Sequence, residues 1–197
     1  MANKTRSPST AGQGSGADHD WEDIGNAATS DDSETYSETE PVDSETDLSS
    51  EKLILGGMDF GLPFNATVQG VAVSIKANSH EDATMTVTLS NGTSASSEKT
   101  ATIAFANNTY VLGSATDTWG SYSDLKDLSE IWVVATDDSD GYLSPYMRVF
   151  GADITIYYTI GTWCPWGPEE ELTAIRFGTD EITKAYFGAD VVFEKDG

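Results

Sequence analysis

VAVSIK, residues 71–76, alternates apolar with small or polar side chains at every second position. A β-strand turns successive side chains to opposite faces of its sheet, so Val71, Val73 and Ile75 are expected on one face. TMTVTL, residues 84–89, repeats the pattern, with Met, Val and Leu opposed by three threonines. Both stretches therefore predict half-buried β-strands.

Further strand signals surround these two stretches, at residues 53–55, 100–105, 109–112, 131–136 and 148–159. The stretch 131–136 is almost wholly apolar, which favours a strand covered on both faces. The Asn91-Gly92 pair is a strong turn signal. The best helix signal is one short turn at residues 122–128, capped by Ser123. Seven short strands with threonine-rich outer faces predict an all-β fold, an antiparallel β-sandwich of jelly-roll-like or Ig-like type at residues 52–160.

The N-terminal quarter is polar and acidic. Residues 1–18 are small and polar, and this composition cannot bury enough apolar surface to offset chain entropy, so we expect a flexible arm that a partner chain holds. Residues 19–51 contain twelve acidic side chains and no Lys or Arg. One interpretation is a solvated, self-repelling linker. The recurrence of Trp21, Tyr36 and Leu48 favours the other, an irregular segment or short edge strands lying on the sandwich.

The C-terminal residues form a separate unit in this interpretation. Pro165 and Pro168 predict a Trp/Pro linker at residues 161–168. A repeat of period ten follows, IRFGTDEI at 175–182 and AYFGADVV at 185–192, and each copy contains a glycine turn between strand-like segments. Residues 169–197 are therefore predicted to form a three-stranded meander, with strands near 172–177, 181–187 and 191–194. Such a meander is too small for a core of its own.

Charge and composition argue against several function classes. The chain of 197 residues has 33 acidic and 10 basic side chains, which gives a net charge of −23. Binding of nucleic-acid phosphates or of an anionic membrane surface needs clustered Lys and Arg, so neither is an expected partner. The single cysteine, Cys164, allows no intrachain disulfide and no Cys-based zinc site. Two histidines leave little acid–base chemistry near neutral pH, and we expect no enzyme activity, no catalytic residue and no cofactor.

Two acidic stretches are candidate metal sites. DDSDG, residues 137–141, resembles half of a calcium loop, but placing Gly141 at position 6 of an EF-hand puts Met147 at position 12, where a Glu is required. An acidic turn is the favoured interpretation, and a calcium loop of another type stays open. His19 offers one imidazole among acidic neighbours. We therefore predict no metal ligands.

Aromatic side chains near predicted loops could stack on a ligand or contact a partner. The candidates are Trp119, Tyr142, Trp163 and Trp166. A domain of this size also needs aromatic residues in its core, so burial or a protein interface is the favoured interpretation for each of them.

The order of several short patterns resembles a family of tailed-bacteriophage minor structural proteins, the accessory proteins of head, neck and tail. The opening of that family is similar to Trp21, Asn-Ala-Ala at 26–28, Ser-Asp-Asp at 30–32 and Tyr36. A second similarity covers GMDFGLP at 57–63 with ATVQGVAVSI at 66–75, and a third covers Trp119-Gly120 with ADITIYYT at 152–159. The C-terminal FGTD and YFGAD turns resemble a short repeat that ends many phage tail proteins.

This resemblance implies a non-enzymatic virion protein that is built on a β-sandwich. Its expected partners are other virion proteins and copies of itself, contacted through the N-terminal arm and the C-terminal meander. Its expected location is the virion, assembled in the host cytoplasm. The alternative function is a receptor- or carbohydrate-binding module at a tail tip or fibre, with a host-surface glycan or receptor as partner.

Overall fold

The computed structural model describes twelve segments of the chain. They are residues 1–15, 20–28, 37–39, 49–79, 83–120, 122, 125–137, 147–161, 175–177, 180–182, 184–187 and 190–194. For 37–39, for residue 137 and for the segments from 175 onward, the description is limited to the backbone. The chain divides into two compact units, Met1–Gly161 and Thr162–Gly197.

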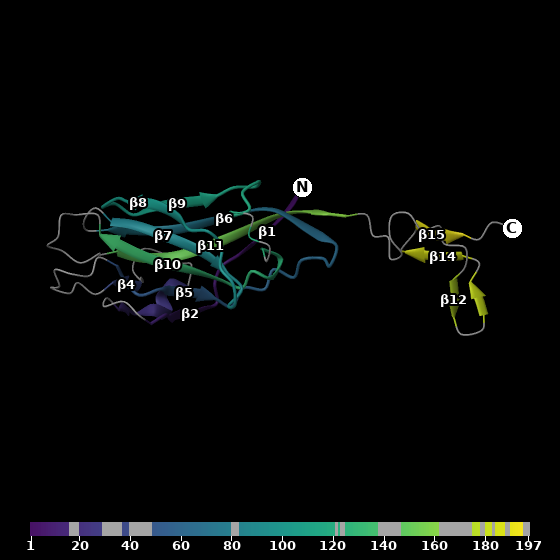
Figure 1. Cartoon of the computed structure of the whole chain (residues 1–197), viewed down its shortest axis with the longest axis horizontal. Coiled ribbons are helices and arrows are strands. Elements are labelled where there is room, and N and C mark those ends of the chain that lie inside the picture. The colour runs from purple at the N-terminus through teal and green to yellow at the C-terminus, as the bar shows by residue number, and fades with distance from the viewer. Residues whose placement is uncertain are drawn as a thin grey trace. The chain divides into compact units, whose positions relative to one another are not determined.

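The first unit is an antiparallel β-sandwich, which confirms the predicted fold class (Figure 1). In the described residues, sheet A has six strands: β1 (Ala2–Arg6), β3 (Trp21–Glu22), β4 (Ser37–Thr39), β6 (Ala66–Ser79), β9 (Asn108–Gly113) and β11 (Met147–Ile160). Sheet B has five: β2 (Thr10–Gln13), β5 (Leu53–Gly56), β7 (Ala83–Ser90), β8 (Lys99–Ile103) and β10 (Glu130–Asp137). The described part of this unit also contains two short 3-10 helices, η1 (Ile24–Ala28) and η2 (Leu125–Asp127).

The two longest strands, β6 and β11, pair along almost their whole length in the centre of sheet A. In sheet B, β10 pairs with β7 on one side and with β5 on the other. The alternation seen in the sequence faces the core, because Val71, Val73 and Ile75 have no exposed surface. The seven predicted strands at residues 53–159 are all present, most with bounds one or more residues wider. The predicted helical turn is present as η2.

Strand β10 differs from its prediction. Its side chains alternate between buried and partly exposed, so one face is covered by the core and the other is not fully covered. Val133 has no exposed surface, whereas its neighbour Trp132 is partly exposed and carries the Lys52 ammonium 4.2 Å above its ring. Long amphipathic side chains cover apolar surface while their charged ends stay in water. The prediction that residues 131–136 are covered on both faces is therefore wrong for one face.

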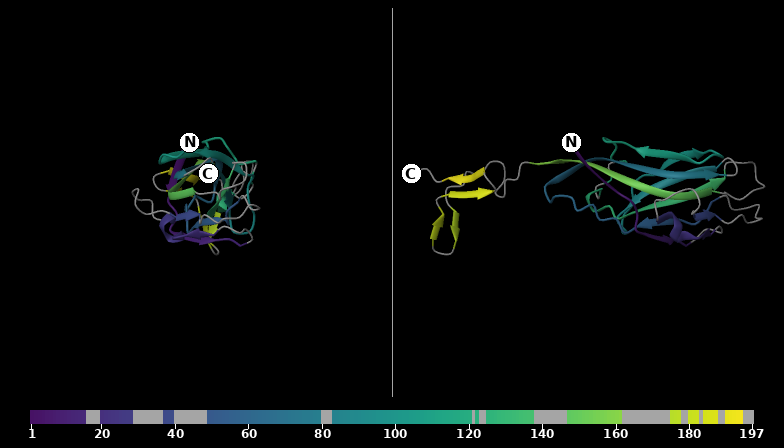
Figure 2. Two further views of the ribbon diagram at one scale, coloured as in Figure 1. Left: turned by 90° about the vertical axis from the view of Figure 1, so that its left-hand side faces the viewer. Right: turned by 180° about the vertical axis from the view of Figure 1, so that it is seen from behind.

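The flexible arm predicted at residues 1–18 is wrong for its described part, residues 1–15. Strand β1 pairs with β11 in sheet A, and strand β2 pairs with β5 in sheet B. Figure 2 shows this purple N-terminal segment passing from one sheet to the other. Edge strands gain backbone hydrogen bonds whatever their side chains are, so a polar composition does not prevent them from forming. We call residues 2–13 the N-terminal strap.

The acidic segment after the strap lies on the sandwich where it is described. Trp21 is 3% exposed, and its indole N–H donates to the Glu51 carbonyl oxygen at 2.7 Å. Ala27, in η1, is fully buried. The interpretation of residues 19–51 as an irregular segment or short strands lying on the sandwich is therefore correct for residues 20–28. Strand β4, which pairs with β11, and the bridge from Ser49 to Thr136 of β10 agree with it.

The described residues of the second unit form two separate hairpins, drawn in yellow in Figure 1. Strand β12 (Ile175–Phe177) pairs with β13 (Asp180–Ile182), and β14 (Lys184–Phe187) pairs with β15 (Asp190–Glu194). The predicted three-stranded meander is therefore wrong in its middle strand, which is divided between β13 and β14. Each repeat of period ten closes a hairpin of its own. Of the predicted linker at residues 161–168, residues 162–168 lie outside the described part of the chain.

Candidate protein contact surface

One end of the sandwich is formed where β6 begins and β11 ends. Ala66 is paired with Ile160 in the sheet register. Beyond this pair, Asn65 and Gly161 are joined by two hydrogen bonds, from the Asn65 side-chain amide to the Gly161 carbonyl at 2.7 Å and from the Gly161 N–H to the Asn65 carbonyl at 3.1 Å. The turn before β6 is therefore fixed against the last residues of β11.

Phe64 and Ile160 are large apolar side chains that are exposed at this end. Phe64 is 73% exposed and Ile160 is 57% exposed. The Lys126 ammonium of η2 donates to the Phe64 carbonyl oxygen, so η2 also holds this turn. Neighbouring exposed apolar side chains within a polar rim are typical of protein contact sites.

Two open hollows share Lys126 in their linings. The first, of about 460 Å³, is lined by Ala66, Thr67, Val68, Thr118, Tyr122, Leu125 and Lys126. The second, of about 390 Å³, is lined by Met58, Asp59, Phe60, Gly61, Leu62, Lys126, Asp127, Leu128 and Ser129. We call Phe64, Ile160 and the lining of both hollows the Lys126 surface.

Several polar groups in these hollows already have partners within the protein. The Tyr122 hydroxyl lies 3.0 Å from the Ser94 hydroxyl and donates to the Ser94 carbonyl oxygen at 2.9 Å. A carboxylate oxygen of Asp59 accepts the N–H of Gly61 at 2.8 Å. These groups therefore shape the walls of the hollows.

The N-terminal strap supports the wall of the second hollow. The Lys4 ammonium donates to the carbonyl oxygens of Phe60 and Gly61, at 2.9 and 2.7 Å. The Arg6 guanidinium donates to the Asp59 carbonyl oxygen at 3.1 Å. Residues that sequence composition assigned to a free arm thus position this surface.

Trp119 belongs to the core and not to a ligand site. Its side chain has no exposed surface, and its indole N–H donates to the Val71 carbonyl oxygen at 2.9 Å. The Lys99 ammonium lies 5.2 Å from the ring centroid. An aromatic ring that is to stack on a sugar needs a free face, so Trp119 is excluded as an exposed ligand contact. Burial, which the sequence analysis favoured, is therefore correct for Trp119.

A polar network fixes the loop that carries Trp119. Asp117 forms an ion pair with Lys99 at 2.7 Å, and its other carboxylate oxygen accepts the Trp119 N–H at 2.8 Å. Partial burial disfavours the charged carboxylate, but the hydrogen bonds from Lys99 and Trp119 and the positive charge of Lys99 outweigh it and lower the pKa of Asp117 below its usual 3.8. Asp117 is therefore a structural carboxylate that holds the loop.

The other sequence-predicted residues cannot be placed. Tyr142, Trp163, Trp166, Cys164, His19 and residues 138–141 of the acidic turn all lie outside the described residues. Within the described segments, no group of three or more His, Cys, Asp or Glu side chains could hold a metal ion.

Sequence reasoning did not identify Phe64, Ile160 or Lys126. One signal was present for Phe64, because an aromatic residue between Pro63 and Asn65 stands in a turn composition outside the apolar alternation. Ile160 continues the alternation of β11, and the loss of cover at the end of the sandwich is what exposes it. A single lysine in a short helical turn carries no signal of its own.

No protein-family model matches the chain, and neither does any curated protein. Within the described residues, no helix has the length and apolarity that a membrane crossing requires. Sequence pattern and surface chemistry therefore have to support any functional assignment.

Proposed function

We propose that this chain is a non-enzymatic structural or accessory protein of a tailed-phage virion, which joins or decorates the head, neck or tail through contacts with other virion proteins. The observation that carries the proposal is the pair of exposed apolar side chains, Phe64 and Ile160, on the Lys126 surface. The resemblance of the sequence to minor structural proteins of tailed phages gives the class of particle.

The chemistry of the surface favours a protein as the partner. Its two hollows are open and mixed in character, because apolar groups such as Val68, Leu125 and Leu128 line them together with a similar number of polar ones. The aromatic hydroxyl of Tyr122 is engaged by Ser94, and the Lys126 ammonium by the Phe64 carbonyl. A surface that mixes apolar and polar groups in this way suits the side chains of a protein partner.

The strongly acidic composition is compatible with this role. A net charge of −23 keeps a protein present in many copies soluble before assembly, because like charges oppose unspecific association. Specific contacts then depend on apolar patches such as Phe64 with Ile160. Because the strap is paired with its own sandwich, contacts with other virion proteins are assigned to the Lys126 surface and not to a free N-terminal arm.

The test is incorporation into particles of the phage that encodes the chain. Phe64→Asp should leave the sandwich folded, because the side chain is 73% exposed, but should reduce the chain's copy number in purified particles as measured by quantitative mass spectrometry. The matched control is Phe105→Asp. Phe105 is similarly exposed, at 69%, but lies at the other end of β6. The residue before it, Ala104, accepts a hydrogen bond from the N–H of Ser79, the last residue of β6. At the usual rise per residue this strand is roughly 45 Å long, so Phe105 is far from the Lys126 surface.

Three results are distinguishable. Loss of Phe64→Asp from particles with normal incorporation of Phe105→Asp supports both the function and the surface. Equal incorporation of both variants would overturn the assignment of the surface. Absence of the wild-type chain from the particles would overturn the virion role itself.

A further inference from the structure

The N-terminal strap covers one edge of each sheet. Strand β1 runs along β11 from Ala2 opposite Tyr158 to Arg6 opposite Ile154. Strand β2 then runs along β5 from Thr10 opposite Gly56 to Gln13 opposite Leu53. Three residues, 7–9, carry the chain from one sheet to the other (Figure 2). The strap therefore binds the sandwich as an added strand binds an open sheet edge.

Backbone pairing and surface polar groups hold the strap. Among residues 1–15, Pro8 is the only one that is buried. The hydroxyls of Thr5 and Thr155 lie 2.8 Å apart, the Ser7 hydroxyl donates to Asp153 at 2.6 Å, and both contacts are exposed. Because little apolar surface must be re-exposed, the strap can leave its site while the core strands β6, β7, β10 and β11 stay packed.

The sequence after the strap is compatible with pairing of the strap to its own sandwich or to the sandwich of a neighbouring copy. Residues 14–20 read GSGADHD, a short stretch of small and polar residues. Residues 16–19 of this stretch lie outside the described residues, and its composition alone is compatible with a connection to the strap's own sandwich or to a neighbouring one. In both arrangements the strap makes the same contacts with the same two edges.

We propose that the strap is an exchangeable element, and that the edges of β11 and β5 form a two-strand acceptor site for the strap of a second copy of this chain. The strap of a second copy has the same sequence, so it can pair with these edges in the register that the strap adopts on its own sandwich. An opened strap would leave two unpaired strand edges, which recruit another strand of matching register. The proposal depends only on strand pairing and stands independently of the virion role.

The test uses the full chain with Cys164→Ser as background, so that each added cysteine is the only one. Thr5→Cys and Thr155→Cys are purified separately, mixed, incubated at 37 °C or refolded together from urea, and then oxidised. Because the two threonine hydroxyls face each other at 2.8 Å, exchange should produce a disulfide between different copies. The expected product runs at twice the chain's 21.1 kDa on a non-reducing gel, and peptide mass spectrometry should identify the 5–155 linkage.

Two matched controls separate exchange from random collision. Thr5→Cys mixed with Thr109→Cys, an exposed threonine on β9 at the other edge of sheet A, should give only the collisional background. The double variant Thr5→Cys/Thr155→Cys, oxidised before mixing, should stay a monomer and exchange no strap until it is reduced. A 5–155 product no higher than the Thr109→Cys background, after incubation and after joint refolding, would overturn the proposal. Failure of the double variant to form its internal disulfide would also overturn it, because the strap would then not lie on β11.

Discussion

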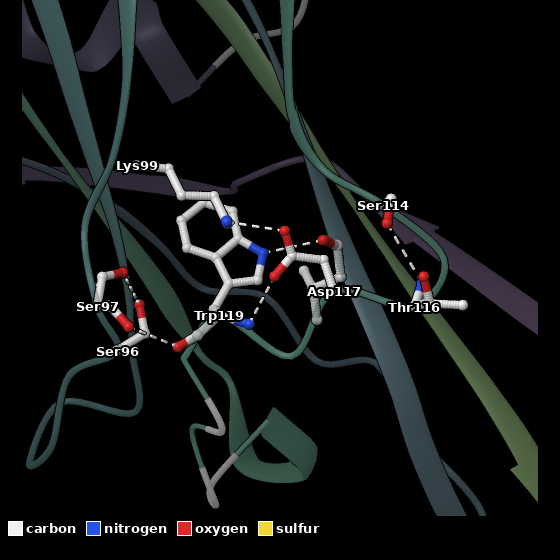
Figure 3. Close-up of polar contacts among 8 residues, drawn as sticks. Ser96, Ser97, Lys99, Ser114, Thr116, Asp117 and Trp119 are labelled. Atoms are coloured by element: carbon white, nitrogen blue, oxygen red, sulfur yellow. Dashed lines mark hydrogen bonds and ion pairs between the residues drawn. The ribbon is translucent and has the colours of Figure 1, made fainter.

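Trp119 and Gly120 both have positive φ angles, +52° and +76°, in the loop between β9 and η2. A residue with a side chain rarely adopts this conformation because its Cβ crowds the backbone. For Trp119 the strain is offset by full burial of the indole and by its hydrogen bond to Val71. Ser97 adds a third restraint, since its hydroxyl donates to the Trp119 carbonyl at 3.0 Å (Figure 3). Packing and hydrogen bonds thus hold a conformation that local preference disfavours.

Replacement of Gly120 by alanine should destabilise the sandwich more than the same replacement at Gly92. Both glycines have positive φ, so each variant should lose about 1–2 kcal/mol from backbone strain. A Cβ at Gly120 would also meet the Ser97 hydroxyl at 1.7 Å, whereas a Cβ at Gly92 meets nothing within 4 Å. Breaking the Ser97–Trp119 bond adds about 1 kcal/mol to Gly120→Ala. Urea unfolding measures both values, and equal losses would contradict the described loop.

Replacement of Asp117 by asparagine should make the free energy of unfolding depend less on pH in the acid range. The pKa of Asp117 is lowered in the folded protein, so its contribution is fully present above its unfolded value of 3.8 and is lost as pH falls through the lower folded value. At pH 7, Asp117→Asn should cost about 1 kcal/mol or less, because the ion pair with Lys99 is partly exposed. Below pH 3.8 the difference between wild type and variant should shrink. Urea unfolding at both pH values checks this, and a constant or growing difference would argue against the ion pair.

At the scale of elements, the strap and the long strands of each sheet differ in how they are held. Strands β6 and β11 pair over most of their length and turn fully buried side chains such as Val73 and Ile154 to the core. Strands β1 and β2 contribute almost no core surface. Elements with few buried apolar contacts open locally without global unfolding. The strap is therefore expected to be the least protected paired segment of the first unit.

Hydrogen exchange should detect this difference directly. Amides of β1 and β2 should exchange at least about 100-fold faster than those between β6 and β11, because they exchange through opening of the strap alone. The Thr5→Cys/Thr155→Cys disulfide should slow exchange in β1 and leave β7 and β10 unaffected. Strap amides as well protected as those of β10 would show that the strap opens only with the whole sandwich.

At the scale of the whole molecule, the chain consists of two units that differ in how much buried core stabilises them. Met1–Gly161 encloses one continuous core, in which residues of both sheets such as Ile75 and Leu89 are fully buried. Thr162–Gly197 contains two short hairpins, and isolated hairpins are at most marginally stable in water. The first unit should therefore fold without the second.

Truncation after Gly161 should leave the unfolding transition of the sandwich at the same midpoint, within experimental error. Circular dichroism at a β-sheet wavelength and the near-ultraviolet signal of buried Trp119 both follow this transition. Addition of the missing residues 162–197 as a separate peptide is the control and should change nothing. A lowered midpoint or the loss of a cooperative transition would mean that the C-terminal unit is part of the main core.

The sequence by itself determined the strands of the sandwich, because the alternation of Val71, Val73 and Ile75 is a local property that any sheet must respect. The turn at Asn91-Gly92 followed in the same way, and Gly92 has the positive φ that such a turn uses. The two-unit division was also readable, because the prolines and the repeat of period ten interrupt the alternation after β11.

Tertiary structure decided the rest. Composition predicts that residues 1–15 belong to a free arm. They form strands instead, because two sheet edges that are distant in sequence supply their hydrogen-bond partners. Burial of Trp119 depends on Val71 and Lys99, and exposure of Ile160 depends on where the opposing layer ends. Local sequence sets the period of the side chains. Which edges are open, which rings are covered and which apolar groups reach the surface depend on segments that meet only when the chain has folded.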